Sequence, residues 1–71
     1  MAKSTLGARL KKARKDRGLS LYRAAIDLDV ERSTVKRWED GVMEPGNDRI
    51  AALAAYYGVR ASWLAFGERV R

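Results

Sequence analysis

The stretch GLSLYRAAIDLDVERSTVKRWEDG, residues 18–41, decides the fold. Ser20 is a favourable N-cap because its hydroxyl can accept a hydrogen bond from a free backbone N–H, and Gly18 can end the preceding helix in a left-handed conformation. The pattern therefore predicts a helix that begins at Leu21. Its apolar residues recur at i, i+3, i+4 and i+7 and make one stripe: Leu21, Ala24, Ala25 and Leu28.

A second helix follows a turn at Asp29-Val30. Val35 and Trp38 lie three residues apart, and Gly41 is a C-terminal stop. At about 100° per residue, an inward Val35 and Trp38 leave an outward face that is polar and mostly cationic. That face contains Ser33, Lys36, Arg37 and Asp40, with Arg32 on its flank.

Two helices joined by so short a turn, the second with donors on its free face, form the unit that places a helix in a DNA major groove. The alternative is a pair of solvated helices in a small bundle, because charged helix faces are common. The distribution of charge favours DNA. Residues 1–37 contain 11 Lys/Arg and 4 Asp/Glu, a net charge of +7, whereas residues 38–71 contain 4 and 5, a net charge of −1.

The composition excludes several classes of function. The 71 residues suffice for a single domain, residues 1–71, with a modest core. The sequence has neither cysteine nor histidine, so we expect no disulfide, no metal, no cofactor and no catalytic site. No apolar run approaches the roughly 20 residues that span a bilayer, and no signal peptide is indicated. We therefore expect a cytoplasmic protein that is not an enzyme and does not bind membranes.

Three further helices complete an all-α prediction, since no alternating pattern indicates a strand. The loop before the fourth helix is marked by Pro45-Gly46. We expect a first helix capped by Ser4 or Thr5 and ending at Gly18, a fourth capped by Asn47 and ending at Gly58, and a fifth over residues 61–66.

One ion pair is expected inside the fold. Arg14 lies close to the apolar stripe of the first helix, where an unpaired guanidinium would cost several kcal/mol. Glu39, four residues after Val35, leans toward the core side of its own helix. The sequence therefore predicts that Arg14 and Glu39 pair and link the first helix to the third.

The outer side of the helix that begins at Leu21 has open interpretations. Tyr22 and Ile26 point away from the apolar stripe, so they either support only their own helix or form a contact patch. Arg23 and Asp27 have the spacing of a surface ion pair. That pair competes with a phosphate-binding role for Arg23.

Characteristic residues are dispersed from Leu6 to Glu68: Leu6-Gly7, Arg9-Leu10, Arg14, Gly18-Leu19-Ser20, Ala25, Val30, Ser33-Thr34-Val35, Trp38-Glu39, Gly41, Pro45, Leu53-Ala54, Gly58-Val59 and Trp63-Leu64-Ala65-Phe66-Gly67. This pattern resembles the xenobiotic-response-element family of helix-turn-helix proteins, whose fold is that of lambdoid phage repressors and Cro. The resemblance covers nearly the whole chain.

The resemblance implies a compact five-helix domain of a prokaryote or phage. Its second and third helices would form the helix-turn-helix that reads double-stranded DNA, usually as a homodimer on a pseudo-palindromic operator. Arg14 and Glu39 match the family's arginine and glutamate on the first and third helices. The positions that match its base-reading residues are Arg32, Ser33, Lys36 and Arg37.

The sequence departs from the family at three places. Leu21 stands where a glutamine usually bridges phosphate and base, and Asp29 replaces the turn glycine, which is tolerable because Asp visits left-handed conformations. Residues 40–44 lack the basic residues with which relatives bind phosphate. Phosphate contacts are therefore expected from Lys11, Lys15, Ser20, Leu21 and Arg23.

The C-terminal segment is rich in large apolar residues. Trp63, Leu64 and Phe66 fall within four positions, and not all of them can be solvated cheaply. Some would complete the core, and the remainder would form a dimer contact. The expected contact residues are Arg60, Ala61, Trp63 and Phe66.

Two functions remain open at this point. The first is a sequence-specific transcriptional regulator, repressor or Cro-like, which the cationic outward face of the third helix favours. The alternative is a protein-interaction module, such as the antitoxin of a toxin–antitoxin pair, which the acidic loop after Gly41 favours. Its contact surface would comprise Leu21, Tyr22, Ile26 and Val42-Met43.

Overall fold

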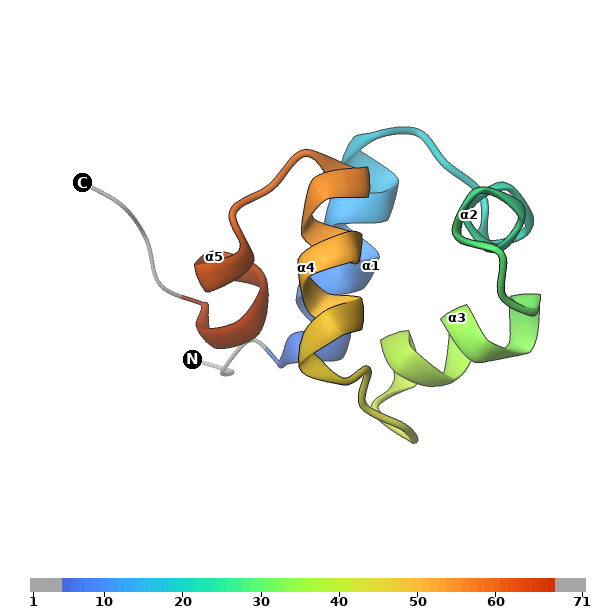
Figure 1. Ribbon diagram of the computed structural model, residues 1–71. Coiled ribbons are helices and arrows are strands. Elements are labelled where there is room, and N and C mark those ends of the chain that lie inside the picture. The colour runs from blue at the N-terminus through green and yellow to red at the C-terminus, as the bar shows by residue number, and fades with distance from the viewer. Residues whose placement is uncertain (1–4, 68–71) are drawn as a thin grey trace.

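The computed structural model describes residues 5–67, and all regular secondary structure within them is helical (Figure 1). The all-α, five-helix prediction is confirmed. The helices are α1 (Leu6–Asp16), α2 (Leu21–Leu28), α3 (Arg32–Asp40), α4 (Asn47–Tyr57) and α5 (Ala61–Phe66).

Side-chain caps begin the first two helices. Thr5 Oγ1 accepts a hydrogen bond from the Ala8 N–H at 3.1 Å, while Ser4, the other candidate cap, lies outside the described residues. Ser20 Oγ accepts a hydrogen bond from the Arg23 N–H at 3.0 Å. Each hydroxyl satisfies a backbone donor that has no partner inside its helix, and this defines where the helix begins.

Left-handed residues end α2 and α4. Asp29 has φ 58° and ψ 46°, so this turn uses the tolerance of Asp for the left-handed region in place of a glycine. Gly58 has φ 71°, and the Val59 N–H reaches back to the Ala54 carbonyl at 3.0 Å. This is the Schellman-type stop expected from the sequence.

The start of α4 differs from the prediction. Gly46, rather than Asn47, is the N-cap, because the Gly46 carbonyl already accepts the Ile50 N–H at 2.9 Å. No side chain caps this end of the helix. Asn47 is the first helical residue, and the prediction that it caps α4 is wrong because helical hydrogen bonding begins one residue earlier.

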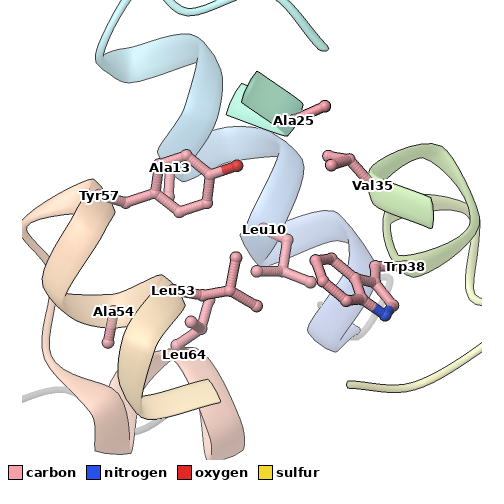
Figure 2. Close-up of a cluster of buried hydrophobic side chains, with 9 residues drawn as sticks. All are labelled: Leu10, Ala13, Ala25, Val35, Trp38, Leu53, Ala54, Tyr57 and Leu64. Carbon is pink, nitrogen blue, oxygen red and sulfur yellow. The ribbon is translucent and has the colours of Figure 1, made fainter. Parts of the chain in front are cut away.

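The core forms where α1 meets the other helices. α1 packs against α3 and α5, α2 packs against α3, and α4 packs against α5. Figure 2 shows side chains from α1, α3 and α4 converging, so the inward side of α3 is fixed by the core while its other side stays at the surface. The buried apolar cluster is Leu10, Ala13, Ala25, Val35, Trp38, Leu53, Ala54, Tyr57 and Leu64.

Gly7 allows the start of α1 to lie against the end of α3. A Cβ at Gly7 would lie 2.8 Å from the Trp38 carbonyl oxygen and closer still to the Glu39 carbonyl oxygen. Both oxygens belong to the backbone, so no side-chain rotation could relieve the clash. Glycine at this position therefore permits the helix crossing that places α3.

Tyr57 makes the stability of the fold depend on pH in the alkaline range. Burial, and then the nearby Glu39 charge, raise the pKa of Tyr57 from 10.0 to about 12. The folded state disfavours the phenolate, so the stabilisation is complete below pH 10 and is lost as pH rises toward 12. We expect this loss to reach about 2 kcal/mol at pH 12.

Denaturant unfolding of the native chain and of Tyr57→Phe between pH 9 and pH 12 measures this effect. The Phe variant should lose less stability over that range. Parallel pH curves for the two proteins would show that Tyr57 does not titrate late in the folded state.

Candidate nucleic-acid interface

The outward face of α3 carries the four residues that the sequence places in base reading. Val35 and Trp38 point into the core and are 1% and 5% exposed, which turns the opposite side of the helix outward. The exposed residues on that side are Arg32, Ser33, Lys36 and Arg37. The structure thus gathers all four on one accessible surface.

The cations of this face are not equivalent. Lys36 Nζ lies 2.8 Å from Asp40 Oδ2, one turn further along the helix. Arg32 and Arg37 have no acidic partner among residues 5–67. Their planar guanidinium groups, with donors arranged in a fixed fork, are free to bind an acceptor pair.

Helix α1 divides its basic residues between the surface and the interior. Lys11 and Lys15 are exposed, one turn apart, and form no ion pair within the described residues. Lys12 is paired with Asp16 at 3.1 Å. Lys11 and Lys15, the two predicted phosphate-binding lysines of α1, are therefore the available ones.

The role of Arg9 was missed at the level of sequence. Its side chain is 7% exposed, and it donates to the carbonyls of Leu64 at 2.9 Å and Ala65 at 3.1 Å. These bonds satisfy carbonyls near the end of α5. Arg9 lies three residues after Leu6 and four before Ala13, and this spacing could have placed it on the inward side of α1.

The ion pair expected between Arg14 and Glu39 is present and mostly buried. Arg14 Nε donates to Glu39 Oε2 at 2.7 Å and Nη2 donates to Oε1 at 3.0 Å, with the two side chains 9% and 4% exposed. The hydrogen bond to Glu39 raises the pKa of Arg14. Arg14 Nη1 also donates to the Leu19 carbonyl at 2.8 Å, so one side chain ties α1 to α3 and to the segment before α2.

The N-terminus of α2 offers less to a ligand than the sequence suggests. Leu21 is partly buried and packs against the core, which leaves its backbone N–H rather than its side chain. Arg23 Nε donates to Asp27 Oδ2 at 3.2 Å, and the Tyr56 hydroxyl donates to the same oxygen at 2.5 Å. The predicted ion pair between Arg23 and Asp27 is therefore present, and Tyr56 of α4 joins it, which the sequence does not indicate.

The surface around α5 separates as expected into core and exterior. Leu64 is fully buried, Trp63 is partly buried, and Phe66 is 75% exposed. Arg60 and Ala61 are exposed beside them. The residues predicted to form a dimer contact thus include a large apolar side chain that this chain leaves in water.

Residues 5–67 contain neither a metal-binding cluster nor a membrane-spanning helix. No cluster of three or more His, Cys, Asp or Glu residues there could hold a metal ion. No helix in that range is long and apolar enough to cross a membrane.

Comparison with known proteins agrees with the all-helical fold. A family model described as a helix-turn-helix domain matches residues 5–63 of the 71, a range that begins before α1 and reaches into α5. No curated protein matches the chain.

Proposed function

The chain belongs to the helix-turn-helix domain family, and from this premise we propose that it is a sequence-specific regulator of transcription that binds double-stranded DNA in the manner of a repressor or Cro. Members of this family are typically DNA-binding proteins rather than enzymes. The observation that carries the proposal is the outward face of α3, on which Arg32 and Arg37 are exposed and have no acidic partner within the described residues.

Base reading is assigned to this face of α3. A major groove admits one α-helix, and an arginine can donate two hydrogen bonds to guanine O6 and N7. Arg32 and Arg37 take this role in the proposal. Ser33 contributes a hydroxyl, and Lys36 contributes an ammonium that Asp40 holds at 2.8 Å in the free protein.

Phosphate contacts are assigned to α1 and to the start of α2. Lys11 and Lys15 supply unpaired ammonium groups. At the start of α2, the Ser20 cap and the backbone N–H of Leu21 supply neutral donors. Arg23 donates to Asp27 through Nε, so its terminal N–H groups remain for a phosphate. These contacts set affinity and orientation without reading sequence.

Substitutions on the two surfaces should have different effects on DNA binding. Arg37→Ala or Arg32→Ala should cost about 1 to 3 kcal/mol on the operator and flatten the preference at one base pair per half-site. Lys15→Ala or Lys11→Ala should weaken binding to operator and random DNA alike. Each should also lower the slope of log affinity against log salt concentration by about one. Fluorescence anisotropy on operator and scrambled duplexes across a salt series measures both. Equal losses on the two duplexes for the α3 arginine variants would contradict base reading by α3.

The α5 surface is proposed as the contact of a homodimer on a pseudo-palindromic operator. Because Phe66 is exposed beside the partly buried Trp63, a second copy could cover both. Sedimentation should show two protomers on an operator whose half-sites lie about one helical turn apart. One protomer bound at full affinity to an isolated half-site would rule out this dimer.

Selection from random duplexes at moderate salt is the direct test of the proposed function, since it identifies the operator and measures binding to it in one experiment. A regulator of this kind should enrich a pseudo-palindromic motif. Failure to enrich any motif, with weak binding to all duplexes, would favour the protein-interaction alternative. The exposed Tyr22 and Ile26 on α2 would then be the first surface to examine.

A further inference from the structure

Several surface cations of this chain are held by an aspartate of their own helix. Lys12 pairs with Asp16, Arg23 with Asp27, and Lys36 with Asp40, each four residues apart. A DNA phosphate must compete with these carboxylates for the cation. Cations without an acidic partner should therefore bind phosphate more effectively than the paired ones.

Arg49 is such a cation, and the tertiary structure places it beside α3. It lies in the first turn of α4 and is exposed, and within residues 5–67 it forms no ion pair, although Glu44 and Asp48 are near it in sequence. Its guanidinium carbon lies 6.0 Å from the ring centroid of Trp38, in the second half of α3. In Figure 1 the loop between the two helices places the start of α4 near the end of α3.

The guanidinium lies over the ring of Trp38, and this contact uses none of its hydrogen-bond donors. A cation over an aromatic face is attracted by the π electrons, so the N–H groups in the guanidinium plane remain available. A carboxylate partner would occupy two of them, as Glu39 does with Arg14. Arg49 is thus oriented and still able to bind a phosphate through two parallel hydrogen bonds.

The loop next to Arg49 lacks any cation of its own. Residues 41–46 contain one charged residue, Glu44, and no lysine or arginine. A helix lying in a major groove brings the DNA backbone past its ends, where cations stabilise the complex. We propose that Arg49, oriented by Trp38, binds a DNA phosphate beside the C-terminal end of α3; the inference rests on the proposed DNA-binding function.

Two substitutions of Arg49 test the proposal. Arg49→Met keeps an unbranched apolar chain over Trp38 and removes the charge, while Arg49→Lys keeps the charge and removes the planar fork. Arg49→Met should weaken binding to operator and scrambled duplexes by the same factor. It should also lower the slope of log affinity against log salt concentration by about 0.9. Arg49→Lys should keep the native slope and bind with an affinity between those of the native protein and Arg49→Met.

Lys12→Met is the matched control, because it removes one exposed positive charge from a lysine that pairs with Asp16 and has no proposed contact with DNA. It should leave the slope nearly unchanged. The proposal is overturned if Arg49→Met and Lys12→Met have equal slopes, or if Arg49→Lys loses as much slope as Arg49→Met. Thermal melts of each variant give the temperature below which all are folded, and binding is compared there. A native protein without salt-dependent affinity for any duplex would instead contradict the proposed function itself.

Discussion

Replacing Glu39 by alanine is expected to lower the free energy of unfolding by about 3 kcal/mol, because it leaves the buried Arg14 guanidinium without its carboxylate. Both side chains are almost fully removed from water and share two hydrogen bonds, at 2.7 and 3.0 Å. In the native chain those two bonds, together with the bond from Arg14 to the Leu19 carbonyl, offset the desolvation of Arg14. Thermal and denaturant unfolding measure the loss.

Lys12→Ala is the control for Glu39→Ala. It breaks an exposed ion pair of 3.1 Å and should change stability by less than about 1 kcal/mol. The double variant Arg14→Met/Glu39→Leu should recover part of the loss, since it leaves no charge in the interior. Equal small effects of Glu39→Ala and Lys12→Ala would show that the pair contributes little to the fold.

Gly7→Ala is expected to destabilise the protein by about 3 kcal/mol, at the upper end of what overpacking costs. The added methyl group would overlap the Glu39 and Trp38 carbonyl oxygens, so α1 and α3 would have to separate. The better helix propensity of alanine, about 0.5 to 1 kcal/mol, offsets only part of this. Because α3 is displaced, affinity for operator DNA should fall as well.

Gly46→Ala is the matched control for Gly7→Ala. Gly46 has φ −70°, and a Cβ there would meet nothing within 4 Å. Alanine at this position should change stability by less than about 1 kcal/mol, since its restriction of the unfolded chain opposes its poorer preference for the N-cap of α4. If the two glycine substitutions gave the same melting temperature, close packing at Gly7 would not be what places α3.

The helix boundaries were largely predictable from the sequence because their causes are local. The Thr5 and Ser20 hydroxyls bond backbone groups three residues away, and the left-handed residues that end α2 and α4 act within one turn. The outward face of α3 was predictable for the same reason. Its two inward residues settle which side of the helix remains at the surface.

The pairing of Arg14 with Glu39 is the one distant contact that sequence reasoning anticipated. The pair could be predicted because a charge on an apolar stripe requires a compensating charge, and few carboxylates lie on an inward helix face. The same reasoning, supported by a family resemblance, also placed both residues on the correct helices. Their distances and hydrogen bonds follow only from the packed structure.

The sequence by itself determined which segments are helical and which side of each helix is apolar. Only the tertiary structure decided which distant groups meet: Arg9 with carbonyls of α5 more than fifty residues away, Tyr56 with Asp27, and Arg49 with Trp38. The physical reason is that helical periodicity states only which side of a helix is buried. How helices cross, and which ends come together, depends on side-chain volumes and on close approaches such as that at Gly7.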